Sequence, residues 1–194
     1  MNSALTRLGF ATHPIEAYRY FVGDGVETEA KRALPEDRLD DEIVNKCLAL
    51  NEEEYRRRWA NETTPYPGIT KLLDVLEKRN IPKAILSNKP DDFTQIIVAK
   101  LLSDWSFDSV KGVSSLVPAK PNPAGALQIV DELGIAPQEI FYLGDTNTDM
   151  QTANSAGMFA AGALWGFRTA EELLENGAQT LVENPSDVLD FLKA

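Results

Sequence analysis

The feature that most constrains this fold is a repeated alternation of short apolar runs with amphipathic segments between residues 69 and 177. The apolar runs are bounded by turn residues and are too short for helices, so we expect strands there. The predicted strands are 82–87, 110–113, 140–143 and 159–164, and the predicted helices are 69–79, 91–102, 122–133, 148–156 and 171–176. Strands that alternate with helices predict an α/β fold, with a Rossmann-like parallel sheet flanked by helices.

The first sixty residues show a different pattern, which is helical throughout. The longest predicted helix runs over 40–60, with an apolar face on one side and a dense run of acidic and basic residues on the other. Two prolines and a glycine within Thr63–Gly68 mark a linker or hinge. We therefore expect a small helical domain at residues 1–62 and an α/β domain at residues 63–194.

The charge balance limits the partners of the chain. It has 30 acidic and 19 basic residues, a formal net charge of -11 at pH 7. Nucleic acids and anionic membrane surfaces bind clustered Lys and Arg, so we expect neither as a partner. No apolar run approaches the roughly 20 residues of a membrane span. Cys47 is the single cysteine, which excludes an internal disulfide and favours a cytoplasmic location.

Polar residues that could carry chemistry follow the predicted strands. Ser87 and Asn88 follow the strand at 82–87, Lys120 precedes a helix, and Asp145 and Asp149 flank the turn after 140–143. The two carboxylates offer hard oxygen ligands of the kind that Mg²⁺ binds. Ser87 and Asn88 could bind a phosphate oxygen, and Lys120 would neutralise charge beside carboxylates. Singly, each segment is equally typical of a turn or a helix cap, but the carboxyl ends of parallel strands share one edge, which predicts a single site.

These segments resemble a known family. The order Ser-Asn-Lys, Lys-Pro-x-Pro and Gly-Asp-x-x-x-Asp is similar to motifs two, three and four of the haloacid dehalogenase superfamily. The runs 142–150 and 156–158 are especially similar to the phosphoglycolate phosphatase branch, as are the segments 66–68 and 21–25. The resemblance covers essentially the whole chain and implies a haloacid-dehalogenase-type core at 63–194 with a helical cap at 1–62.

The resemblance also implies a role for each candidate residue. Ser87, with Asn88 beside it, would hydrogen-bond the transferring phosphoryl group, and Lys120 would hold the nucleophile and phosphate charges together. Asp145 would reach Mg²⁺ directly, and Asp149 would support that aspartate or its waters. The cap loop that faces the substrate would contain Gly23, Asp24 and Gly25.

The implied activity is Mg²⁺-dependent hydrolysis of a small anionic phosphomonoester through an aspartyl phosphate, with 2-phosphoglycolate first among the substrates. Closure of the cap over the core would exclude water. A non-catalytic module that keeps affinity for Mg²⁺ or phosphate stays open as an alternative. A receiver domain of the signalling type is disfavoured, because receivers place their acidic pair first. Monomer and homodimer are both open.

One departure from the family matters most. Its first motif, Asp-x-Asp-Gly-Thr after a strand, supplies the nucleophile, and no Asp-x-Asp occurs in these 194 residues. Met1–Gly9 is typical of the last turns of a helix, so we expect that the given sequence is truncated at its N-terminus. We also expect the 194-residue chain to be inactive by itself. The resemblance places the missing strand between 83–87 and 140–143. These two strands would then pair directly, or another segment or chain would fill the slot, or the product would fold poorly.

Four other residues have less specific roles. Lys111 stands in a predicted strand where the family usually has an apolar residue. His13, the only histidine, is expected in a solvent-exposed turn, and Cys47 is expected to be a small buried hydrophobe. Arg168 could help an anionic site, or its loop could be structural.

Overall fold

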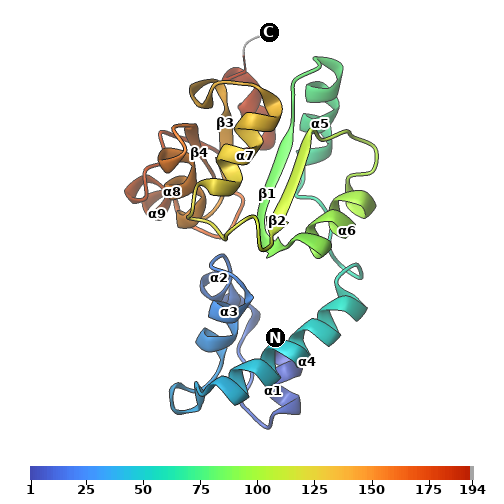
Figure 1. The fold of residues 1–194 in the computed structure, drawn as a ribbon, viewed down its shortest axis with the longest axis vertical. Coiled ribbons are helices and arrows are strands. Elements are labelled where there is room, and N and C mark those ends of the chain that lie inside the picture. Colours follow the sequence, from blue (N-terminus) through green and yellow to red (C-terminus); the bar gives the residue numbers. More distant parts are fainter. Residues whose placement is uncertain (193–194) are drawn as a thin grey trace. The chain divides into compact units, whose positions relative to one another are not determined.

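The computed structural model describes residues 1–192 and divides into two compact units, Met1–Thr64 and Pro65–Ala194 (Figure 1). The division falls inside the segment of prolines and glycine at residues 63–68. In the described part of the chain, no helix combines the length and the apolar character needed to cross a membrane.

The first unit is built from helices alone. In chain order they are α1 (Asn2–Arg7), η1 (Ile15–Ala17), α2 (Tyr18–Phe21), α3 (Val26–Ala33), η2 (Glu36–Arg38) and α4 (Asp41–Arg58). Leu5 of α1, Ala30 of α3 and Cys47 of α4 are fully buried and form the centre of its hydrophobic core. Asp40 starts α4, since its carboxylate accepts a hydrogen bond from the amide of Ile43.

Two expectations about single residues of this unit have different outcomes. Cys47 is fully buried as predicted, and this burial raises the pKa of its thiol, which disfavours a reactive thiolate. His13 does not lie in an open, solvent-exposed turn. It is half-buried, its Nε2 lies 2.8 Å from the carbonyl oxygen of Ala33, and its ring packs edge-on against Phe21. The expected exposure was wrong because the turn folds back onto α2 and α3.

The second unit alternates helices and strands. Its elements are α5 (Ile69–Lys78), β1 (Ala84–Pro90), α6 (Asp91–Leu101), β2 (Ser109–Val113), α7 (Ala124–Leu133), η3 (Pro137–Glu139), β3 (Phe141–Gly144), α8 (Asn147–Ser155), β4 (Phe159–Ala163), α9 (Ala170–Glu175), β5 (Thr180–Val182) and η4 (Pro185–Asp190). Every predicted strand and helix of this region is present within a few residues of its expected bounds, which confirms the α/β fold. The sequence pattern did not reveal β5 or η4.

The strands form two parallel sheets. One has the order β1-β2 and the other the order β3-β4-β5. In residues 1–192, no backbone hydrogen bond joins β1 to β3. The alternative in which these two strands close up and pair directly is therefore wrong. The remaining alternatives, a slot filled by another segment or a poorly folded isolated product, stay predictions.

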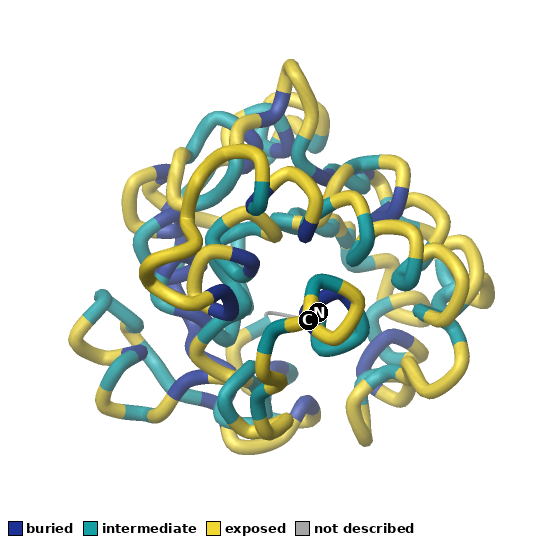
Figure 2. Tube along the Cα trace, turned by 90° about the horizontal axis from the view of Figure 1, so that it is seen from below, coloured by how far each residue is buried: buried dark blue, intermediate teal, exposed yellow. Residues whose placement is uncertain are grey.

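Buried residues are spread along much of the chain (Figure 2, dark blue). Those of the second unit include one hydrophobic core that the two sheets share. Leu86 of β1 and Tyr142 of β3 both pack against the cluster that contains Met150 of α8 and Ala126 of α7. Successive side chains of a strand point to opposite faces, so the neighbours of Tyr142 in β3 join a second cluster with α5 and η4. The β3 sheet is thus covered on both faces, as is usual for parallel sheets.

Lys111 in β2 fits this arrangement without weakening it. Its ammonium lies 2.6 Å from a carboxylate oxygen of Glu132 on α7, and Ser109 donates to the other oxygen of the same carboxylate at 2.6 Å. A charged residue is tolerated in the strand because its partner is supplied by the helix that covers it.

Candidate active site

Lys120 connects the two sheets. Its ammonium donates to the carbonyl oxygen of Leu86 in β1 at 3.1 Å and to Oδ1 of Asp149 in α8 at 2.7 Å. Only 11% of the lysine side chain and 7% of the aspartate side chain are exposed. A buried opposite-charge pair therefore joins the middle of β1, where Leu86 and Ser87 lie, to the first turn of α8, just after the turn that contains Asp145.

Asn88 holds the loop of Lys120 in place. The amide of Lys120 donates to Oδ1 of Asn88 at 2.7 Å, and Nδ2 of Asn88 donates to the carbonyl oxygen of Lys120 at 3.1 Å. This reciprocal pair uses both ends of the Asn88 side-chain amide. The adjacent Ser87 hydroxyl is half-buried and accepts from the amide of Lys89 at 3.1 Å. A hydroxyl that accepts in this way keeps its proton available to donate to a further group.

Asp149 lies at the centre of this network. Besides Lys120, its carboxylate accepts from the hydroxyl of Tyr142, the amides of Asp145 and Thr146, and the hydroxyl of Thr146. Thr146 and Asp149 together form a capping box at the start of α8. With five donors on its two oxygens, Asp149 serves to fix the turn and the lysine.

Gly144 makes this turn possible. A Cβ atom built on it would lie 2.2 Å from Cβ and 2.5 Å from Cγ of Asp149. No side chain fits at that distance. The glycine that begins the Gly-Asp-x-x-x-Asp segment is therefore required by the close approach of the Asp149 side chain.

Asp145 has a different environment from Asp149. Its Oδ2 accepts from the amide of Phe167 at 3.0 Å, and no other residue among 1–192 donates a hydrogen bond to its Oδ1. Burial raises the pKa of Asp145, and the negative charge of Asp149 adds to that rise. Burial also acts on Asp149, but Lys120 and Thr146 outweigh it and lower the pKa of that carboxyl. Asp149 is thus held ionised, and Asp145 is the carboxylate with an open oxygen.

The side chains available as ligands limit the kind of metal ion that this site could bind. In the described residues, no group of three or more His, Cys, Asp or Glu could hold one. The oxygens of Asp149 already accept five hydrogen bonds from the described residues, so of these two aspartates Asp145 has the more available carboxylate oxygen, Oδ1. Mg²⁺ commonly keeps several waters and is bound by one or two carboxylates together with a substrate phosphate. The residues present fit an ion of that kind, held by Asp145.

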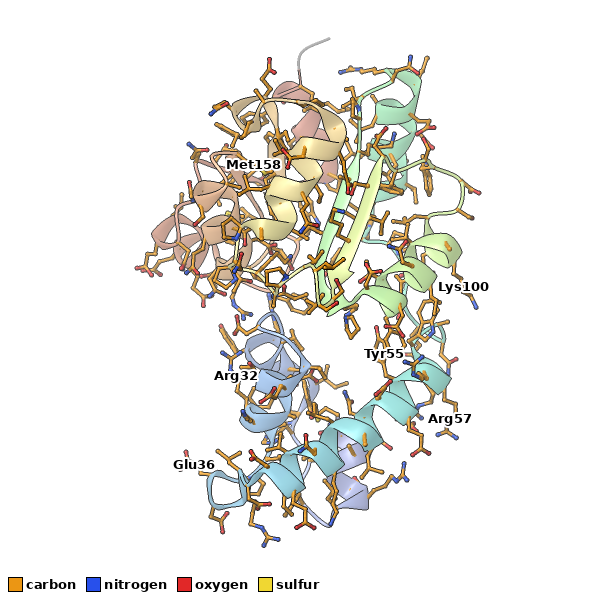
Figure 3. All side chains as sticks on the ribbon, viewed as in Figure 1. Arg32, Glu36, Tyr55, Arg57, Lys100 and Met158 are labelled. Atoms are coloured by element: carbon orange, nitrogen blue, oxygen red, sulfur yellow. The ribbon has the colours of Figure 1, made fainter. Side chains whose placement is uncertain are left out.

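The candidate cap loop lies in the first unit, between α2 and α3. Gly23 and Gly25 adopt positive φ angles of 113° and 92°, which favour glycine. Arg32 of α3 fixes this loop: its guanidinium pairs with Asp24 at 2.6 Å and donates to the carbonyl oxygens of Tyr20 and Phe21 at 3.0 and 3.2 Å (Figure 3).

Sequence reasoning missed several residues that shape this site. Tyr142 and Thr146 donate to Asp149, Phe167 donates to Asp145, and Arg32 holds the loop of Asp24. Thr146 was detectable in principle, because Thr followed by Asp at the third position is a capping pattern. The contribution of Phe167 comes from its backbone amide, which carries no signature in the sequence.

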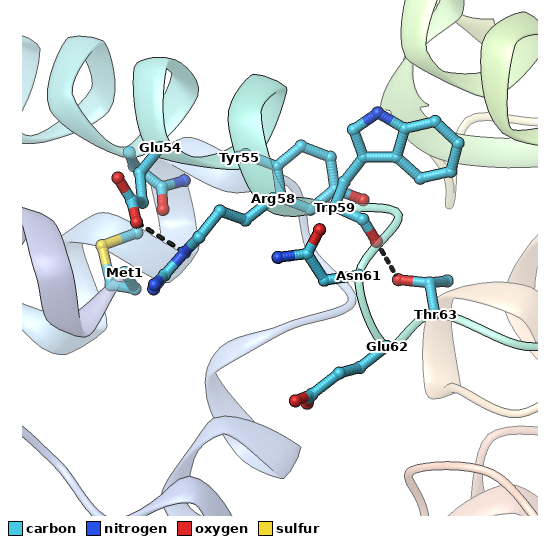
Figure 4. A pocket seen from close by; sticks show the side chains of 9 residues that line it. Met1, Glu54, Tyr55, Arg58, Trp59, Asn61, Glu62 and Thr63 are labelled. Carbon is cyan, nitrogen blue, oxygen red and sulfur yellow. Dashed lines mark hydrogen bonds and ion pairs between the residues drawn. The ribbon is translucent and has the colours of Figure 1, made fainter.

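A separate pocket lies in the first unit at the end of α4 and has a volume of about 400 Å³ (Figure 4). It is lined by Met1, Asn51, Glu54, Tyr55, Arg58, Trp59, Asn61, Glu62 and Thr63. Its most prominent polar groups already have partners, since Arg58 pairs with Glu54 at 2.6 Å and the Thr63 hydroxyl donates to the carbonyl of Trp59. None of the residues predicted to carry chemistry lines it, so we assign it no role.

Comparison with known proteins defines the class. The family model of haloacid dehalogenase-like hydrolases matches residues 5–157, which is most of the chain. The chain belongs to this family. The fold agrees: a Lactobacillus delbrueckii subsp. bulgaricus protein of known structure superposes with a TM-score of 0.91 at 27% identity, over 98% of this chain and 88% of that one.

The relatives narrow the comparison to one branch. A phosphoglycolate phosphatase of Pseudomonas putida is 30% identical over 199 residues, covering 100% of this chain and 70% of the relative. Phosphoglycolate phosphatase 1 of Pseudomonas aeruginosa is 28% identical, over 97% of this chain and 71% of its own length. The chain is a phosphoglycolate phosphatase-like member of the family, and its relatives are phosphoric monoester hydrolases.

Proposed function

We propose that this protein is a Mg²⁺-dependent phosphatase of small phosphomonoesters, with 2-phosphoglycolate as the first substrate to test. The observation that carries the proposal is the position of Lys120. Its ammonium joins β1 at Leu86, next in sequence to Ser87, to the carboxylate network of Asp149 and Asp145. A hydroxyl, a cation and an available carboxylate oxygen on adjoining segments match what phosphoryl transfer needs.

Each residue of the chain has a defined part in the proposed reaction. Ser87 donates to an oxygen of the transferring phosphoryl group, and Lys120 offsets the negative charge that gathers there. Asn88 positions Lys120, and Asp149 fixes both the lysine and the turn. Asp145 would hold Mg²⁺, which when bound supplies further charge stabilisation at the phosphoryl oxygens. Gly23, Asp24 and Gly25 form the loop that we propose to contact the substrate.

The covalent step needs a group that these 194 residues lack. In the proposed reaction an aspartate carboxylate attacks phosphorus, the ester P–O bond breaks, and the departing oxygen takes up a proton. Water then cleaves the aspartyl phosphate and releases inorganic phosphate. No Asp-x-Asp is present to supply the nucleophile and its partner. We therefore propose that the 194-residue chain by itself does not turn over.

The absence of Asp-x-Asp from this sequence also favours a second candidate, a non-catalytic module that binds phosphate or Mg²⁺. It would use the same Ser87, Lys120 and Asp145 without chemistry. We place either protein in the cytoplasm, as a monomer or homodimer, with a small anionic phosphomonoester as its ligand.

The test compares the printed chain with one that carries a strand and Asp-x-Asp-Gly-Thr ahead of Met1. Release of phosphate from 2-phosphoglycolate is measured with Mg²⁺ and with EDTA. We expect turnover from the extended chain with Mg²⁺ and none above background from the 194-residue chain. Phosphate binding by both chains without turnover from either would establish the non-catalytic module.

A matched pair of serine variants in the extended chain tests the site itself. Ser87→Ala should lower turnover about 100-fold or more, the usual loss when a donor to the transition state is removed. Ser103→Ala removes an exposed hydroxyl whose one hydrogen bond to a described residue, Asp104, is 3.5 Å long. It should leave turnover unchanged. Equal effects of the two substitutions would remove Ser87 from the reaction.

A further inference from the structure

The segment that follows β4 lies against Asp145. The amide of Phe167 donates to Oδ2 of Asp145 at 3.0 Å, and the amide of Arg168 donates to the backbone carbonyl oxygen of Asp145 at 3.2 Å. Two consecutive amides therefore hold both the side chain and the backbone of one residue that is more than twenty positions earlier in the chain.

Gly166 shapes the same contact. A Cβ atom built on it would lie 2.1 Å from Cβ and 2.2 Å from Oδ2 of Asp145. The glycine is not explained by its backbone, because it is not among the glycines of positive φ. It is explained by the approach of the Asp145 side chain, which leaves no room for even a methyl group.

We propose that Gly166, Phe167 and Arg168, here named the Asp145 clamp, are positioning residues that fix the orientation of the Asp145 carboxylate. The clamp binds one oxygen, Oδ2, through the Phe167 amide and so directs the other oxygen. The two oxygens are chemically equivalent, but an unclamped carboxylate could turn about χ2 and lose the orientation that the site needs. The clamp also places a donor, rather than water, on the oxygen that does not face the site. This inference rests on the proposed function, in which Asp145 holds Mg²⁺.

The first experiment uses the 194-residue chain and needs no activity. Amide hydrogen exchange is measured by NMR in the wild type, Asp145→Ala and Asp145→Asn. Exchange at Phe167 should become about tenfold faster in Asp145→Ala, which removes the acceptor, and stay near the wild-type rate in Asp145→Asn, which retains an acceptor oxygen.

Two neighbouring amides serve as controls. Arg168 donates to the Asp145 backbone, and Leu164 donates to the carbonyl of Val182 at 3.0 Å, so neither depends on the Asp145 side chain. Both should exchange at the wild-type rate in Asp145→Ala. The clamp is refuted if the exchange rate of the Phe167 amide is unchanged in Asp145→Ala. It is also refuted if all three amides exchange faster together, because that would indicate a general destabilisation of this region.

The second experiment measures positioning in the extended chain that carries Asp-x-Asp-Gly-Thr. Gly166→Ala should raise the Mg²⁺ concentration for half-maximal activity about tenfold or more, since the added methyl group displaces the Asp145 carboxylate. Gly134→Ala is the control. Gly134 has a positive φ of 64°, and an added Cβ would have no atom within 4 Å, so this substitution lowers stability without contacting Asp145. An equal shift in both variants, or none in Gly166→Ala, would overturn the positioning role.

The two experiments separate the clamp from the proposed function. Absence of turnover in every form of the extended chain would refute the phosphatase, while hydrogen exchange at Phe167 would still decide whether the clamp exists. Full turnover with an unshifted Mg²⁺ dependence in Gly166→Ala would keep the phosphatase and refute the clamp.

Discussion

Replacement of Lys120 by methionine tests the central ion pair of the site through stability alone. Methionine keeps most of the apolar stem and removes the ammonium, which leaves the Asp149 carboxylate buried with 7% of its side chain exposed. Removing one partner of a buried pair typically costs about 3–5 kcal/mol. Four donors remain on the carboxylate, from Tyr142, Asp145 and the amide and hydroxyl of Thr146. We therefore expect Lys120→Met to lower the free energy of unfolding by about 3 kcal/mol, near the lower end of that range, from a total of about 5–15 kcal/mol.

The pH dependence of the stability of Lys120→Met provides a second, independent test of this prediction. The lowered pKa of Asp149 means that the pair stabilises the fold above the ordinary aspartate pKa of about 3.9, and that this stabilisation is lost as the pH falls through the lowered value. In Lys120→Met, burial is no longer opposed by the ammonium, so the carboxyl takes up a proton at a higher pH. The deficit relative to wild type should therefore narrow between pH 7 and pH 4.

The assay is urea unfolding followed by tryptophan fluorescence in a Trp59→Phe background. Trp59 belongs to the first unit, so the signal of Trp105 and Trp165 then reports the second unit alone. Lys111→Met is the matched control, because Lys111 lies 2.6 Å from Glu132, whose side chain is 48% exposed and can be hydrated when left alone. It should cost clearly less than Lys120→Met.

The double variant Lys120→Met with Asp149→Asn removes both charges and should recover part of the loss. The reasoning fails if Lys120→Met costs no more than Lys111→Met. It also fails if the deficit at pH 4 equals that at pH 7, because an unpaired buried carboxylate must titrate.

Two further predictions concern Asp145 and the cap loop. Burial and the charge of Asp149 raise the pKa of Asp145, so ionisation of this carboxyl lowers the stability of the fold as the pH rises through the raised value. Asp145→Asn should therefore raise the melting temperature at pH 7 in EDTA by a few degrees, and this gain should shrink towards pH 4. A lower melting temperature at pH 7 would contradict the prediction. Arg32→Ala should speed hydrogen exchange across residues 20–25, since Arg32 pairs with Asp24 and binds the carbonyls of Tyr20 and Phe21 at the end of α2. Arg7→Ala, which breaks an exposed pair with Glu53, should not change this exchange, and equal rates in the two variants would show that Arg32 does not hold the loop.

The class of fold was determined by local signals in the sequence, and the same signals predicted where the site lies. Apolar runs of strand length between amphipathic helices gave the α/β second unit, and the proline- and glycine-rich segment lies where the two units divide. Ser87, Asn88, Lys120, Asp145 and Asp149 were predicted as site residues, because polar residues after successive strands of a parallel sheet gather at one edge. The strand β5 was missed because three residues, Thr180–Val182, are too few to show a period.

Only the tertiary structure decided how the two aspartates differ. In the sequence, Asp145 and Asp149 are two carboxylates four residues apart, and only the resemblance to the family implied that Asp145 reaches Mg²⁺ while Asp149 supports it. In the fold, Asp149 takes five donors, from Lys120 and from the residues of its own turn and strand, while Asp145 keeps one oxygen open and receives the amide of Phe167 from beyond β4. Three of these six donors are backbone amides, those of Asp145, Thr146 and Phe167. A backbone amide is the same in every residue except proline, so the sequence does not mark it as a partner of a carboxylate. Lys120 and Phe167 in addition reach the two aspartates only because distant segments pack together.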